Sequence, residues 1–218
     1  SKIHNPTWRS TWDWGLFIGG AVPPLIFGVA FGNLLQGVPF GFDDYLVSTY
    51  TGSFWQLLNP FALLAGVVSS AMITMHGGTY LAHRTEGAMM KKTGKELAES
   101  QQRAVRGAVG AAAVLVAAFI GAGIWLRYGG IEGFVITSVV DPAALPDPLA
   151  KTVVRSADAW WANYAAQPLL YALPVLGVVG ALVAAVLVSV RRTLSAFVAS
   201  ALAIVGVIGT AGAAMFPF

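Results

Sequence analysis

Cysteine is absent from this chain of 218 residues. The absence excludes disulfide bonds, thiolate metal sites and thiol nucleophiles. Charged residues are also scarce: they make up 11% of the chain, whereas a soluble domain contains about 25%. Hydrophobic residues make up 56%, and the mean hydropathy is +0.70. This combination excludes an ordinary soluble globule and indicates a membrane protein.

The hydrophobic residues gather in five runs, each long enough to cross a bilayer, which takes about 20 residues. We expect spans at about 14–35, 54–75, 104–126, 167–190 and 194–216. Backbone polar groups have no water partner in lipid, and long runs without alternation are typical of helices rather than barrel strands. The sequence therefore predicts an all-α polytopic membrane protein, with residues 1–218 forming a single transmembrane domain.

The thirteen basic residues divide unevenly between the two sides of this five-span arrangement. Arg127, Lys151 and Arg155 fall on one side, and the other ten fall on the opposite side. Because basic loops favour the cytoplasm, we expect residue 1 on the cytoplasmic side and residue 218 on the outer side. This topology explains the net charge of +3, so we expect no nucleic acid partner.

The sequence offers no catalytic candidate and no metal site. It contains no nucleophile paired with a base, no paired carboxylates and no phosphate-binding glycine loop. His4, His76 and His83 fall at or beyond the cytoplasmic ends of the predicted spans, away from the depth at which two helices could hold a haem. We interpret them as interfacial hydrogen-bonding residues.

Asp13 is the polar residue that admits a functional interpretation. It lies between Trp12 and Trp14 at the predicted start of the first span. A carboxylate at the membrane edge is a candidate for a proton path. The alternative is an acid in the first helical turn that complements the helix dipole.

Four amides, Asn33, Gln36, Gln56 and Asn59, fall near the outer surface. Amides in such places join loop backbone to helix ends, so we expect a structural role for all four. Further along, the run "GAVGAAAVLVAAFIGAGIW" favours close helix packing, which predicts that the third span lies in the middle of a bundle. The stretch "KTVVRSADAWWANYAA" predicts a short amphipathic helix at the interface.

Four stretches carry a resemblance to a known family. They read "WDWGLFIGGAVPPLIFGVAFGNLLQGVPF", "YTGSFWQLLNPFALLAGVVSSAM", "VVRSADAWWANYAAQPLLYALPVLGVV" and "TAGAAMFPF". They resemble subunit II of the cytochrome bd quinol oxidase family, and the similarity runs over essentially the whole chain.

The resemblance implies a heterodimeric oxidase of the bacterial cytoplasmic (inner) membrane that passes electrons from quinol to dioxygen. The haems and the quinol-oxidising loop belong to cytochrome bd subunit I. Subunit II supports that partner and contributes to proton supply. We therefore expect this chain to bind no haem itself, while membrane lipids contact its helices and a structural quinone or lipid is a further candidate ligand.

The family fold implied by the resemblance is two four-helix bundles plus a further helix. The chain begins with Ser1 and stops at the end of an apolar run, so we expect a piece that holds one helix of the first bundle and the whole second bundle. Two other functions stay open. A secondary transporter would need a substrate site near the midplane, and a structural membrane-assembly subunit would need no site.

Overall fold

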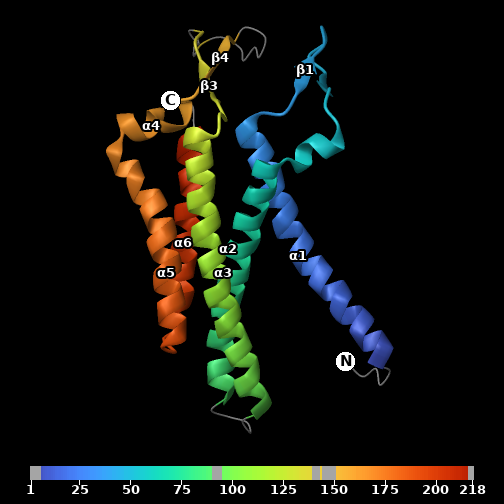
Figure 1. Ribbon diagram of the computed structural model, residues 1–218, viewed down its shortest axis with the longest axis vertical. Helices are drawn as coiled ribbons and strands as arrows, with labels where there is room; N and C mark the ends of the chain where they lie inside the picture. The colour runs from blue at the N-terminus through green and yellow to red at the C-terminus, as the bar shows by residue number, and fades with distance from the viewer. Residues whose placement is uncertain (1–5, 90–94, 139–142, 144–150, 216–218) are drawn as a thin grey trace.

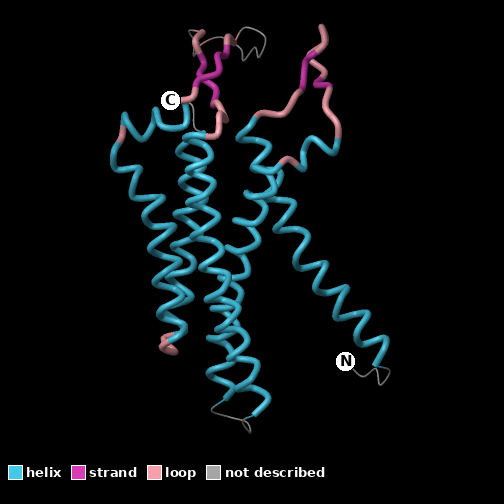
Figure 2. Tube along the Cα trace, in the orientation of Figure 1, coloured by secondary structure: helices cyan, strands magenta, loops and turns pink. Residues whose placement is uncertain are grey.

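The computed structural model describes residues 6–89, 95–138, 143 and 151–215. Its five long helices are α1 (Pro6–Gln36), α2 (Pro60–Met89), α3 (Lys95–Tyr128), α5 (Ala172–Ser189) and α6 (Thr193–Met215). Each contains a segment that is long and apolar enough to cross a membrane. The prediction of an all-α polytopic membrane protein with five spanning helices is confirmed (Figures 1 and 2).

Helices α2, α3, α5 and α6 form a four-helix bundle. Helix α2 packs against α3 and α6, and α5 packs against the same two helices. Helix α1 packs against α2 through Gly28 and Gly32, whose Cα atoms lie so close to the backbone of Ala65 and Ala62 that a side chain would not fit. Toward its N-terminus α1 leans away from the bundle (Figure 1). The arrangement is one helix beside a complete bundle.

The second span lies later in the sequence than 54–75. Residues Phe54–Leu58 form a short 3-10 helix, η1, and the spanning part of α2 runs from Pro60 to Thr85. Asn59 sets this start, because its Oδ1 accepts a hydrogen bond from the backbone N–H of Ala62 at 2.8 Å. Pro60 follows at the first helical position, which needs no N–H donor.

The other four spanning segments agree closely with the predicted ones. They are Ser10–Gln36, Glu99–Tyr128, Pro168–Ser189 and Thr193–Met215. The predicted end of the last span at residue 216 lies outside the described residues.

Two β-hairpins stand at one end of the molecule, and the sequence analysis did not predict them. In the first, β1 (Phe40–Phe42) pairs antiparallel with β2 (Ser48–Tyr50); in the second, β3 (Gly133–Ile136) pairs with β4 (Val153–Ser156). The helix expected over 151–166 is therefore only partly correct. Its first half is strand β4, and α4 begins at Ala159 and ends at Ala166. A short 3-10 helix, η3 (Pro168–Tyr171), leads from α4 into α5.

Helix α2, rather than α3, occupies the central position, so the expectation for the third span is wrong. Helix α2 packs against α1, α3, α5 and α6. On α3, Gly107, Gly110 and Gly121 have open space where a side chain would begin. The helices approach closely where other glycines lie: Gly177 and Gly180 on α5 face Gly206 and Ala203 on α6, and Gly78 on α2 faces Ala104 and Ala108 on α3.

Candidate functional site

The C-terminal end of α1 is tied to the segment before α2 by amide side chains. Asn33 is buried, and its Nδ2 donates to the carbonyl oxygens of Val29 at 2.8 Å and Leu57 at 2.7 Å. Its Oδ1 accepts a hydrogen bond from Asn59 Nδ2 at 3.1 Å. One amide thus joins α1, the backbone of η1 and the residue that caps α2.

Gln56 and Gln36 lie in the same region but differ in their contacts. Gln56 Oε1 accepts a hydrogen bond from the backbone N–H of Ser53 at 3.0 Å, at the start of η1. Gln36 Oε1 is buried and has no hydrogen-bond partner among the described residues. All four predicted amides line a small cavity of about 210 Å³. The hydrogen bonds of Asn33, Gln56 and Asn59 are with backbone and with each other, which fits a structural role for these three.

Asp13 lies on the exposed surface of α1, between the exposed indoles of Trp12 and Trp14. Helix α1 begins at Pro6, so Asp13 lies about two turns inside the helix, beyond the first turn where the dipole acts. The interpretation of Asp13 as a first-turn acid is therefore wrong. Within the described part of the chain, Asp13 makes no hydrogen bond or ion pair.

The placement of His76 corrects a second expectation. Because α2 starts at Pro60, His76 lies inside the spanning segment Pro60–Thr85 rather than at its end. Its Nδ1 lies 2.8 Å from Ser200 Oγ on α6, and its ring stacks on Phe197 with centroids 4.6 Å apart. Asn59 followed by Pro60 was the sequence signal that could have placed this histidine correctly.

Thr79 extends this polar contact between α2 and α6. Its Oγ1 lies 3.0 Å from Ser200 Oγ and donates to the carbonyl oxygen of His76 at 2.8 Å. Two turns beyond His76 on α2, His83 Nδ1 lies 3.0 Å from Thr193 Oγ1, at the start of α6. His4 lies outside the described residues. Among the residues that the structure describes, no three His, Cys, Asp or Glu side chains lie together as a metal site.

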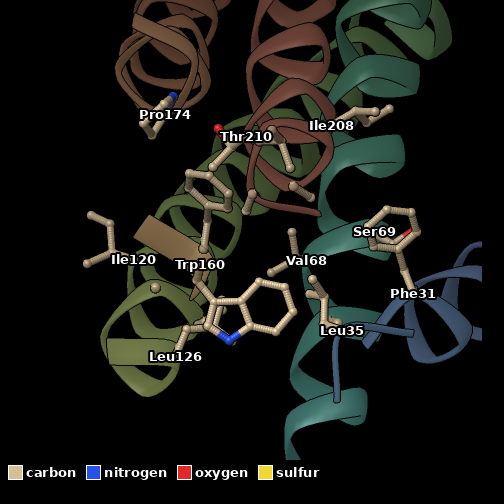
Figure 3. Close-up of a pocket in the computed structure, with 18 of the residues that line it drawn as sticks. Phe31, Leu35, Val68, Ser69, Ile120, Leu126, Trp160, Pro174, Ile208 and Thr210 are labelled. Carbon is tan, nitrogen blue, oxygen red and sulfur yellow. The ribbon is translucent and has the colours of Figure 1, made fainter. Parts of the chain in front are cut away.

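An apolar cavity of about 460 Å³ opens between the helices toward the hairpin end. Helices α1, α2, α3, α5 and α6 all contribute to its wall, together with α4. Figure 3 shows Phe31, Leu35, Val68, Leu126 and Trp160 among the side chains around it. The walls are almost entirely hydrocarbon and aromatic, so the cavity favours an apolar occupant.

A few polar groups stand at the edge of this cavity. Trp160 Nε1 donates to the carbonyl oxygen of Ile131 at 3.0 Å, and Tyr164 Oη donates to that of Thr210 at 2.7 Å. Burial raises the pKa of Tyr164, so its hydroxyl stays neutral at physiological pH. Trp161 also lines the cavity, and its Nε1 is buried with no partner among the described residues.

Comparisons with known proteins agree with the motif resemblance. The family model described as cytochrome bd terminal oxidase subunit II matches residues 1–218. The chain is 50% identical over 218 residues to cytochrome bd-I ubiquinol oxidase subunit 2 of Escherichia coli (strain K12), covering all of this chain and 54% of that protein. It is 47% identical, with the same coverage, to the probable cytochrome oxidase subunit 2 of Haemophilus influenzae.

A more distant relative is the cytochrome bd ubiquinol oxidase subunit 2 of Bacillus subtilis, 31% identical over 97 residues, which are 43% of this chain and 27% of that protein. The chain spans about half the length of the curated relatives that it matches from end to end. Because the family model covers every residue, the chain belongs to the cytochrome bd terminal oxidase subunit II family.

Proposed function

We propose that this chain is part of the non-haem subunit of a cytochrome bd-type respiratory quinol:oxygen oxidoreductase. The observation that carries the proposal is the 50% identity, from the first residue to the last, with a protein named as subunit 2 of a ubiquinol oxidase. The fold supports it, because one helix beside a complete four-helix bundle is the part of the family fold that the resemblance implied.

In this proposal the partner is cytochrome bd subunit I, which holds the haems and oxidises quinol. This subunit supports that partner through apolar helix surfaces. Large apolar side chains such as Phe17 and Phe27 on α1 and Ile124 on α3 are exposed in the isolated chain. A buried contact with other helices would remove such side chains from lipid, and membrane lipids would cover the rest.

We place the protein in the bacterial cytoplasmic (inner) membrane, with the end that carries Arg191 and Arg192 in the cytoplasm. The N-terminus of α1 lies at the same end as the α5–α6 turn, and the two hairpins lie at the opposite end (Figure 1). Of the basic residues that the structure describes, seven belong to the first end: Arg9, Arg84, Lys95, Arg103, Arg106, Arg191 and Arg192. This asymmetry supports an outer location for the hairpins and for the C-terminal end of α6.

We further propose that the large apolar cavity holds a long hydrocarbon chain, either the tail of a quinone or the acyl chain of a lipid. Its volume of about 460 Å³ falls within the range of about 300–1,000 Å³ typical of ligand pockets. The unpartnered Nε1 of Trp161 supplies a donor for an oxygen atom of the bound molecule. No catalytic role follows from such a ligand, which would fill space between the helices.

A substitution at Gly123 tests the cavity proposal. Gly123 lines the cavity and has open space at its Cβ position, so Gly123→Leu would fill part of the cavity without a backbone clash. We expect the full-length protein with Gly123→Leu to retain less quinone or lipid, measured by mass spectrometry of extracts. Gly121→Leu, also facing open space but outside the cavity lining, is the control. Equal retention in both variants would contradict the proposal.

The oxidase function itself is tested by respiration. Membranes from a bacterium without other terminal oxidases should consume oxygen with quinol when the full-length subunit is expressed together with subunit I. Expression of subunit I alone should give little stable oxidase, because its contact surface would be uncovered. Full quinol-dependent oxygen uptake without this subunit would contradict the proposal.

A further inference from the structure

The contacts between α2 and α6 form a line of polar side chains that enters the spanning part of the bundle. His76 and His83 lie seven residues apart on α2, and Thr193 and Ser200 lie seven residues apart on α6. Seven residues are about two helical turns, so the two pairs stack above one another along a single seam. The lower pair, His83 and Thr193, lies beside the α5–α6 turn. The upper pair, His76 and Ser200, lies within the span and is joined by Thr79.

The hydrogens available in the upper group restrict the tautomer of His76. Four contacts link His76 Nδ1, Ser200 Oγ, Thr79 Oγ1 and the carbonyl oxygens of His76 and Phe197. Each hydroxyl supplies one hydrogen, and the carbonyls supply none. Ser200 donates to Phe197 and Thr79 donates to His76, so both hydroxyl hydrogens are used. A hydrogen on Nδ1 adds a third donor, so three of the four contacts become hydrogen bonds, whereas the Nε2–H tautomer leaves only two donors for the four contacts. We therefore assign the Nδ1–H tautomer to His76.

The Nδ1–H tautomer leaves Nε2 of His76 as an unprotonated acceptor. Among the described residues Nε2 has no hydrogen-bond partner, and the imidazole is only partly buried. A proton that binds at Nε2 would leave the three hydrogen bonds donated by Nδ1, Ser200 Oγ and Thr79 Oγ1 intact. The flat contact with Phe197, at 4.6 Å, adds an aromatic face that a cationic ring can stack on.

The groups around His76 include few charges. Helix α6 contains no titratable residue, and neither does α5. On α2 the nearest titratable groups are Tyr80 and His83. The Tyr80 ring contacts the ring of Phe197, and His83 belongs to the lower pair with Thr193. Among the described side chains, α2, the N-terminal half of α3 and the α5–α6 turn carry six charges, all exposed and toward the end with that turn: Arg84, Glu99, Arg103, Arg106, Arg191 and Arg192.

We propose that His76 is a proton-binding site inside the membrane-spanning part of this chain. Ser200 holds the imidazole as the Nδ1–H tautomer, and a proton arriving along the seam from the end with the α5–α6 turn binds at Nε2. Neutral imidazole and one proton give imidazolium, and water at the polar end supplies the proton. An ionisable side chain within a membrane helix commonly marks such a path. The site rests on the α2–α6 contacts and is independent of the oxidase function.

Nitrogen NMR of the full-length protein with its partners, labelled with ¹⁵N-histidine, tests this site. His76→Gln, or His76→Asn if the first variant does not assemble, identifies the signal by its loss. At about pH 9 we expect the His76 signal of the neutral Nδ1–H tautomer, and lowering the pH to about 5 should convert it to imidazolium. A signal that stays neutral throughout, or that shows the Nε2–H tautomer, would overturn the proposal.

A pair of serine variants separates positioning from a general structural effect. Ser200→Ala removes the acceptor of Nδ1–H, so the Nδ1–H form should fall from the main tautomer to a minor one. Ser195→Ala, an exposed position on the same helix, should leave the tautomer unchanged. An unchanged tautomer in Ser200→Ala would show that Ser200 does not position His76.

Discussion

At the scale of single residues, Tyr164 links stability to pH. Its hydroxyl is buried and donates to the carbonyl oxygen of Thr210, which fastens α4 to α6. Burial raises the pKa of Tyr164 above its usual value. Folding therefore favours the neutral form of Tyr164. The contribution of Tyr164 to the free energy of unfolding is complete below about pH 10, the unfolded pKa, and is lost as the pH rises through the higher folded pKa.

Tyr164→Phe should lower the free energy of unfolding by about 1 kcal/mol at pH 8, because one hydrogen bond is lost. The difference from the parent should shrink as the pH rises above about 10, since phenylalanine does not ionise. Thermal unfolding of the full-length protein in detergent at several pH values measures both effects. Tyr128→Phe, at a site 81% exposed, is the matched control. A constant difference at every pH would contradict this explanation.

Asp13 gives a second prediction at this scale. Asp13→Asn should leave the amount of assembled complex unchanged, because Asp13 is exposed, makes no hydrogen bond or ion pair with the described residues and lies beyond the first turn of α1. If Asp13 belongs to a proton path, turnover should slow while the haem content stays constant. Quinol-dependent oxygen uptake and the haem spectrum of the same preparation measure the two quantities. Loss of assembled complex would instead indicate a structural role.

At the scale of helices, the α5–α6 contact depends on glycine. A side chain at Gly206 would meet the backbone N of Gly177, and also the carbonyl oxygen of Leu173 at 2.7 Å. Gly206→Ala should therefore destabilise the protein by about 1–3 kcal/mol through overpacking. Gly212→Ala meets open space on the same helix and should be neutral or slightly stabilising. Thermal unfolding of both full-length variants checks this, and equal stabilities would contradict it.

The sequence was sufficient for the helices because each depends on a long apolar run. It predicted four of the spans closely and the fifth with a shift, since apolar residues precede Asn59 and extend the hydrophobic run past the start signal formed by Asn59 and Pro60. That shift concealed the position of His76 within the span. The hairpins were missed because β1 and β2 are three residues long and fully exposed, so no alternation marks them. His76 and Ser200 are 124 positions apart in the sequence, so no local sequence pattern could predict their contact.

At the scale of the whole molecule, the described helices expose large apolar side chains that other helices or lipid can cover. Helices α1, α2, α3 and α6 are continuous through their spanning segments, and the fourth segment changes only at its start, from η3 to α5. A secondary transporter instead builds its site at broken helices. The chain has no cysteine, and the two described histidines both bond through Nδ1 to hydroxyls of α6. In the function that we propose, electron transfer belongs to the partner, and this chain contributes packing surface and a cavity for a hydrocarbon chain.

The optical spectrum of the tagged full-length protein, isolated with and without subunit I, tests this central claim most directly. Co-expression should yield a coloured complex that contains the tagged subunit together with a haem-bearing partner. The tagged subunit purified alone should show no Soret absorption after haem is supplied, because the account assigns every haem ligand to the partner. A stoichiometric haem spectrum from the subunit alone, or a co-expressed complex without haem, would contradict the account.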